Sequence, residues 1–105
     1  MFKHTLYIGT QYDKDSKAIK NSAELVRLAK KQAADKFGGF NAHESQGGYI
    51  MASTGELVTE TSLVLTIFAN VTSEVAEFAA DMARLFNQES VRFEDADGLG
   101  SFVAQ

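Results

Sequence analysis

The chain has 105 residues, of which 45% are apolar, with a net charge of −4, no cysteine and no proline. This length fits a single domain over residues 1–105, with a thin core because such a domain buries only about 60–70% of its unfolded surface. The lack of cysteine excludes disulfides and thiolate metal sites. No apolar run is long enough to cross a membrane. The chain starts at Met1 and leads directly into a strand pattern without a signal peptide, so we expect a cytoplasmic protein.

The charge is distributed unevenly along the chain. Residues 1–36 carry eight Lys and Arg against four Asp and Glu, whereas residues 37–105 carry two against ten. An acidic protein is a poor general binder of nucleic acid, because phosphate contacts need clustered cations. Two explanations of the asymmetry stay open: a basic first helix lies beside an acidic second helix, or the basic region binds an anionic or carboxylate-bearing ligand.

The first part of the chain predicts a strand, a loop and a helix. Lys3 to Gly9 alternates in polarity, which indicates a strand with one buried face, and the polar residues 10–20 predict a loop. Asn21 and Glu24 resemble a capping box, and Gly38-Gly39 is expected to end the helix. The apolar positions at helical spacing are Leu25, Leu28, Ala29, Ala33 and Phe37.

The middle of the chain predicts a long hairpin. Phe40 to Ser53 is a second strand, Thr54-Gly55-Glu56 is the turn, and Leu57 to Ala69 is the strongest strand pattern. In this third strand Leu63, Leu65 and Ile67 share one side with Thr59 and Thr61. The other side carries Glu60, Ser62, Val64, Thr66 and Phe68.

The last part predicts a helix and a strand. Asn70 or Thr72 is the expected cap of the second helix, and Glu89 to Glu94 predicts a fourth strand. The tail from Gly98 to Gln105 forms either a short edge strand or a contact between subunits. The apolar stripe of the helix consists of Val75, Phe78, Ala79, Met82, Leu85 and Phe86.

The resulting order, βαββαβ, predicts an α+β, ferredoxin-like sandwich. Two helices would cover one face of a four-stranded antiparallel sheet. The other face would carry Thr, Tyr and scattered apolar residues. Because so small a protein rarely leaves such a face uncovered, we expect a homo-oligomer.

Two glycines, Gly47 and Gly48, interrupt the second strand just before Tyr49. Glycine in a strand leaves no side chain to pack. The pair is either a bulge that bends the strand or a place where the backbone approaches a ligand. Tyr49 is either a packing residue or a hydroxyl donor and acceptor on a rigid arm.

Glu60 is the strongest candidate for a functional residue. It shares a strand face with Val64 and Phe68, so its carboxylate must find a partner or stay at the surface. It is either a surface glutamate at the start of the strand or a carboxylate that binds a cationic group. Tyr49 and Glu60 lie at similar distances from the turn, and residues at equal distances across a hairpin are neighbours. Both are therefore expected at one pocket.

The remaining chemistry-bearing residues give weaker signals. His4 and His43 lie on different predicted strands with no third ligand at metal spacing, which favours structural roles. The sequence has no nucleophile elbow, no phosphate-binding glycine loop and no nucleophilic triad.

At the hairpin the sequence resembles the phage-encoded S-adenosylmethionine lyases, formerly called hydrolases. The resemblance consists of Gly48-Tyr49, the turn through Gly55, Glu60 before Leu63-Val64-Leu65, and the helix from Ser73, within roughly residues 40–95. It implies a trimer with active sites between subunits. It also implies conversion of S-adenosylmethionine to 5′-methylthioadenosine and homoserine lactone, which depletes the host methyl donor and counteracts restriction.

The resemblance also implies roles for individual residues. By position, the catalytic glutamate is Glu60 and the active-site tyrosine is Tyr49. The adjoining residues expected to bind substrate are Gln46, Gly47, Gly48 and Thr61. No metal or cofactor is expected, because the substrate carboxylate can attack its own γ-carbon and the sulfonium is a good leaving group. No nucleic acid or membrane partner is expected.

Two alternatives belong to other functional classes. The chain is a non-catalytic anti-defence module, which sequesters a nucleotide ligand or binds a host protein through its acidic half, or it is a plain oligomerisation domain. A binding module would release its ligand intact, whereas a lyase would return two products.

Overall fold

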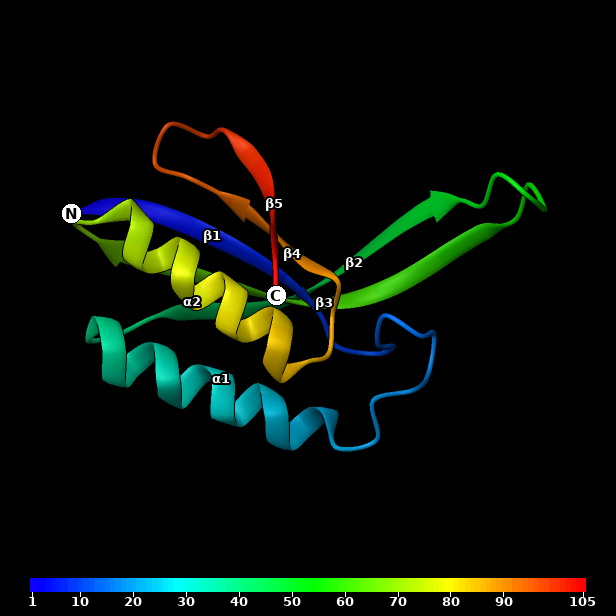
Figure 1. Ribbon diagram of the computed structural model, residues 1–105, viewed down its shortest axis with the longest axis horizontal. Helices are drawn as coiled ribbons and strands as arrows, with labels where there is room; N and C mark the ends of the chain where they lie inside the picture. The colour runs from blue at the N-terminus through cyan, green and yellow to red at the C-terminus, as the bar shows by residue number, and fades with distance from the viewer.

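The computed structural model describes residues 1–105 as an antiparallel sheet with two helices packed on one face (Figure 1). The elements in chain order are β1 (Phe2–Gly9), α1 (Ser22–Phe37), β2 (Asn41–Ile50), β3 (Leu57–Ala69), α2 (Thr72–Leu85), β4 (Ser90–Glu94) and β5 (Gly100–Ala104). The strands lie in the order β2-β3-β1-β4-β5. The predicted βαββαβ order is confirmed up to β4. The sheet has five strands instead of the predicted four, because the tail forms β5 beside β4; the edge strand considered for residues 98–105 is thereby confirmed.

One apolar core lies between the sheet and the helices. β1 and β3 contribute the alternate residues that the polarity pattern predicts, and the predicted stripe of α2 packs against them. From α1 only Ala29 and Ala33 are fully buried, whereas Leu28 is 40% exposed, so its place in the predicted stripe is wrong. Small residues let α1 approach the sheet closely, and Leu28 lies on the flank of that contact. Neither helix is long and apolar enough to cross a membrane.

The sequence signals place both ends of α1 correctly but not the start of α2. Gly38 adopts the left-handed conformation (φ 84°), and its N–H donates to the carbonyl of Ala34, as predicted for the end of α1. Asn21 holds the predicted N-cap position of α1, but its side chain makes no capping hydrogen bond, and neither Asn70 nor Thr72 caps α2. Val71 holds the cap position of α2, and the hydroxyl of Thr72 instead pairs with the buried ring of His4.

The hairpin of β2 and β3 is longer than the sheet to which it belongs. β1 pairs with β3 only over Ser62–Ala69, whereas β2 pairs with β3 down to Leu57. Residues 46–61 therefore form a two-stranded arm that projects from the body of the domain (Figure 1). Its turn is closed by the N–H of Met51, which donates to the carbonyl of Glu56 at 2.8 Å, and by Gly55 at φ 72°.

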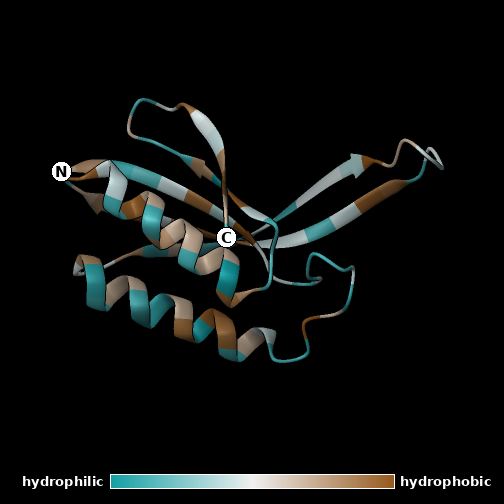
Figure 2. Ribbon diagram, in the orientation of Figure 1, coloured by the Kyte–Doolittle hydropathy of each residue, from teal (hydrophilic) through white to brown (hydrophobic).

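The arm is exposed on both sides and apolar near its tip. Ile50 and Leu57, which pair with each other, are 63% and 66% exposed. Figure 2 shows hydrophobic segments at this end of the hairpin, away from the helices. A hairpin that packs on nothing adds little to the stability of a single chain, so the arm leaves an apolar surface exposed at its tip.

Candidate functional site

The arm brings the two main predicted residues onto one face of the sheet. Glu60 pairs with Gly47, and Tyr49 pairs with Val58, so Tyr49 and Glu60 occupy diagonal positions of one ladder. Both point away from the helices, on what we call the open face. Diagonal neighbours lie roughly 7–8 Å apart, which is within reach of a single ligand.

Tyr49 and Glu60 are not enclosed within a single chain. Tyr49 is half exposed, Glu60 is exposed, and neither side chain forms a hydrogen bond or an ion pair. Neither residue lines a cavity of the chain. Within one chain both groups are therefore unpaired and open to solvent.

The two glycines have different surroundings. The strand is continuous through Gly47 and Gly48 in unbroken register, so the bulge considered for them is wrong. A Cβ at Gly48 would lie 3.2 Å from the carbonyl oxygen of Val58 and 3.3 Å from a methyl of Leu57. This crowding explains why the position holds glycine. A Cβ at Gly47 would meet nothing within 4 Å. Gly47 therefore leaves bare backbone beside Glu60.

The sheet separates the other predicted residues from this pair. Because side chains alternate along a strand, Gln46, Gly48 and Thr61 lie on the helix side. The N–H of Thr61 donates to Oε1 of Gln11 at 2.7 Å, and its carbonyl accepts from Thr10. Thr61 thus contacts the loop after β1 and not the pair on the open face.

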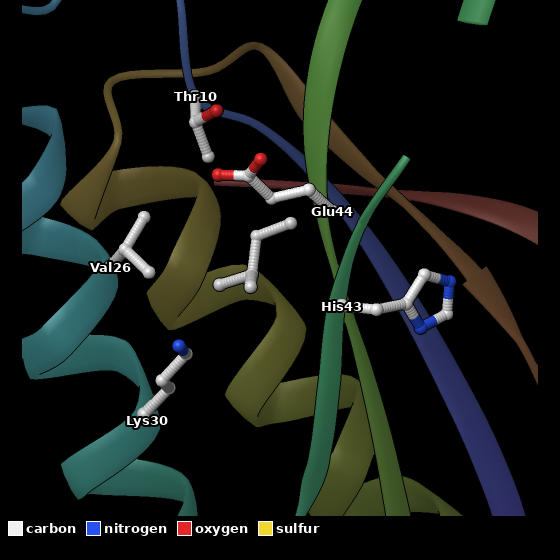
Figure 3. Close-up of a pocket in the computed structure, with 6 residues that line it drawn as sticks. Thr10, Val26, Lys30, His43 and Glu44 are labelled. Carbon is white, nitrogen blue, oxygen red and sulfur yellow. The ribbon is translucent and has the colours of Figure 1, made fainter. Parts of the chain in front are cut away.

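A groove on the helix side was not predicted. Two adjoining cavities of about 290 and 470 Å³ share Thr10 and Glu44, at the point where the arm leaves the body. Figure 3 shows Glu44 directed toward Thr10, Lys30 extending from α1, and His43 pointing the other way. The residues that line this groove and matter below are Thr10, Gln11, Val26, Lys30, Glu44 and Leu63.

The wall of the groove formed by the loop after β1 is held by hydrogen bonds. Ser22 donates its hydroxyl proton to the carbonyl of Thr10 at 2.7 Å. The carboxylate of Asp13 accepts from the N–H groups of Asp15 and Lys17 at 2.9 and 3.1 Å. The bond from the Lys17 amide, followed by that from Asp15, lowers the pKa of Asp13 below its ordinary value of 3.8. The loop therefore has a defined shape at neutral pH.

A second polar cluster lies at the centre of the open face. The guanidinium of Arg92 lies 3.9 Å from the ring centroid of Tyr7, and the Tyr7 hydroxyl donates to Glu94 at 3.0 Å. Burial, together with the Glu94 carboxylate, raises the pKa of Tyr7 above 10.0, so the phenol stays neutral at physiological pH. These groups satisfy one another and support the sheet.

The two histidines cannot share a ligand, because they lie on opposite faces. His4 is fully buried, stacks on Phe93 with ring centroids 6.0 Å apart, and pairs with Thr72 at 3.0 Å. His43 is exposed on the open face beside Val64. A structural role for His4 is confirmed by this burial.

Comparison with solved structures identifies proteins of the same architecture. A phage SAM lyase in complex with S-methyl-5′-thioadenosine superposes with a TM-score of 0.68, at 19% identity, over 99% of this chain and 89% of that chain. This chain has the fold of a phage SAM lyase. The apo state of a phage SAM lyase gives a TM-score of 0.60 with the same identity and coverage. The fold of this chain therefore agrees with the sequence resemblance noted at the hairpin.

Other comparisons add nothing to this likeness. No protein-family model matches the sequence, and no curated protein matches it. At 19% identity the likeness to the SAM lyases is one of fold, and function must be argued from the site.

Proposed function

We propose that this protein is an S-adenosylmethionine lyase, which releases 5′-methylthioadenosine and homoserine lactone. The observation that carries the proposal is the placement of Tyr49 and Glu60 together on an uncovered face of the arm. The shared fold with a lyase that was solved with the same thioadenosine product supports it.

The reaction is balanced without a metal, a cofactor or a protein nucleophile. A carboxylate oxygen of the substrate attacks its own γ-carbon, the bond from that carbon to sulfur breaks, and its electron pair stays on sulfur. The cationic sulfonium becomes a neutral thioether, the carboxylate becomes a lactone ester, and no proton is transferred. The protein has only to fold the methionine part into attack geometry, which can lower a barrier by about 7–11 kcal/mol in favourable cases.

Each residue of the pair has a separate role in that task. Glu60 provides a negative charge for the ammonium or sulfonium of the substrate, and Tyr49 fixes the orientation of the substrate through its hydroxyl. Gly47 leaves room for the ligand against the strand beside Glu60. A charge is effective here only when water is excluded, because bulk water screens it.

The surface that covers a ligand at Tyr49 and Glu60 and excludes water is best supplied by other copies of the chain. The exposed tip of the arm, with Ile50 and Leu57, is an apolar surface of the kind that oligomers bury. We therefore propose a trimer in which the arm completes a site between subunits. In a phage-infected cell, the reaction would take place in the host cytoplasm, where loss of the methyl donor would counteract restriction.

The test is the release of product from S-adenosylmethionine, followed by mass spectrometry, for the wild type and Glu60→Gln. The variant keeps the shape of the side chain and removes its charge, and we expect a loss of about 100-fold in rate. Glu56→Gln, at the turn of the same arm, is the matched control and should keep the rate. An unchanged rate in Glu60→Gln would contradict the proposed role.

The same assay separates the other functional classes. Wild-type protein that binds S-adenosylmethionine and returns it intact on denaturation is a binding module. Protein whose melting temperature does not rise with S-adenosylmethionine or with 5′-methylthioadenosine is an oligomerisation domain.

A further inference from the structure

The groove on the helix side holds an unpaired cation and an unpaired anion on opposite walls. Lys30 extends from α1 and Glu44 from β2 (Figure 3), and the apolar side chains of Leu63 and Val26 line the same cavity. The two ion pairs of the chain are Lys31–Asp35 and Arg84–Asp81. Lys30 and Glu44 therefore form no ion pair, although they line the same cavity.

Opposite charges that face one cavity without touching suit a ligand that carries both charges. An α-amino acid has an ammonium and a carboxylate a few bonds apart, followed by an apolar chain. We infer that this groove binds the amino-acid end of S-adenosylmethionine, with its ammonium at Glu44, its carboxylate at Lys30 and its methylenes on Leu63. This inference rests on the proposed function and names the part of the substrate that the groove receives.

The size and surroundings of the groove agree with this ligand. The two adjoining cavities, of about 290 and 470 Å³, together exceed the volume that an amino acid alone requires. The larger one continues past Gln11 to Tyr12, a residue that is 51% exposed. The rest of the substrate therefore has room to extend from the amino-acid end without leaving the groove.

Within one chain, the groove and the pair formed by Tyr49 and Glu60 cannot contact the same ligand molecule. Glu44 faces the helix side of the sheet, whereas Tyr49 and Glu60 face the open side. A substrate held at Lys30 therefore receives Tyr49 and Glu60 from a second copy. This arrangement fits the charges, because the arm presents Glu60 and carries no lysine or arginine, while α1 presents Lys30 at the groove.

The inference is tested with two ligands that differ in the amino-acid end. Lys30→Met should raise the KM for S-adenosylmethionine at least about tenfold. It should leave inhibition by 5′-methylthioadenosine unchanged, because this product has no amino-acid group. Glu44→Gln should likewise raise the KM for S-adenosylmethionine and leave inhibition by 5′-methylthioadenosine unchanged. Lys31→Met, one residue along α1 and paired with Asp35, should change neither value.

Several outcomes would overturn the inference. An unchanged KM in Lys30→Met would do so, as would an equal weakening of both ligands. If the wild type releases no product, the proposed function fails. Binding of the two ligands to the wild type and the same variants, measured by equilibrium dialysis, then tests whether the groove binds the amino-acid end. A wild type that binds neither ligand, or a Lys30→Met variant that binds S-adenosylmethionine normally, would also overturn it.

The involvement of two copies is tested by mixing variants. Lys30→Met and Glu60→Gln are unfolded, combined in equal amounts and refolded, and activity is measured below the KM of the wild type. A site shared between copies should regain about a quarter of wild-type activity, because that fraction of sites pairs an intact groove with an intact arm. Activity no higher than the mean of the two separate variants would contradict a shared site.

Discussion

Tyr49 and Glu60 lie on diagonal positions of the β2–β3 ladder, and both face the side of the sheet that the helices leave open. The ladder fixes this relationship, because Tyr49 pairs with Val58 and Glu60 with Gly47 in unbroken register. No side chain stands between them on the neighbouring strand, since the partner of Glu60 is a glycine. In the proposed function, this arrangement lets both side chains contact one ligand from the same two-stranded support.

Tyr49→Phe should lower the rate of S-adenosylmethionine cleavage about tenfold, the equivalent of one hydrogen bond of about 1–1.5 kcal/mol. The double variant Tyr49→Phe, Glu60→Gln tests whether both act on the same ligand. In that case the combined loss is smaller than the product of the two single losses, because the second change removes an interaction that is already impaired. A loss of steady-state rate in the double variant that equals the product of the two single losses would contradict a shared ligand.

Gly47→Thr should separate folding from activity. A Cβ at Gly47 meets nothing within 4 Å, so the fold accepts the side chain, and a threonine favours the strand by several tenths of a kcal/mol or more. The melting temperature should stay the same or rise, while product release falls because the side chain fills the space beside Glu60. Gly48→Ala is the comparison: its Cβ meets the Val58 carbonyl at 3.2 Å, so stability should fall instead.

The hairpin could be predicted well because its signals are local. Alternating polarity marks β3, whose bounds, Leu57–Ala69, are as predicted, and it correctly places Glu60 opposite the face of Leu63. The position of the turn then sets the register within about two residues, which is enough to put Tyr49 and Glu60 on one face. The residue count from the turn did not give their diagonal offset, because the turn runs from Met51 to Glu56 and is centred earlier in the chain than the predicted Thr54-Gly55-Glu56.

The groove could not be predicted because its residues come from segments far apart in the sequence. Thr10, Lys30 and Glu44 meet only when α1 packs beside the edge of β2. One signal was available in β2, where Glu44 lies two residues after the apolar Ala42 and therefore shares its face of the strand. The predicted cap of α2 failed for a related reason, since a tertiary contact redirects the side chain: Thr72 binds the buried His4 instead of the backbone of α2.

Thr72→Val should destabilise the domain, although Thr72 is exposed. Its hydroxyl is the one hydrogen-bond partner of the His4 ring, whose Nδ1 already has none. Removing it leaves a fully buried ring without a partner, at a cost of about 1–3 kcal/mol in the free energy of unfolding. Ser73→Ala, at the next position and without a hydrogen bond to its side chain, should change urea unfolding little. Equal effects of the two substitutions would show that the His4 contact contributes nothing.

Stability at acid pH should depend on Asp13. Hydrogen bonds from the amides of Lys17 and Asp15 lower the pKa of Asp13 below 3.8, so the folded state binds fewer protons there than the unfolded state. The resulting stabilisation is fully present above pH 3.8 and is lost as the pH falls through the lowered pKa. Asp13→Asn should therefore be less stable than the wild type at pH 6, and the difference should shrink below pH 3.8.

Urea unfolding at several pH values and an NMR titration of the Asp15 and Lys17 amides measure this effect. Asp15→Asn is the control, because its carboxylate is exposed and accepts no hydrogen bond in the structure. A stability difference between Asp13→Asn and the wild type that stays constant from pH 6 to pH 3 would show that the carboxylate is not held by the loop. Since Thr10 and Gln11 precede this loop and line the groove, a loop loosened by acid should also weaken ligand binding there.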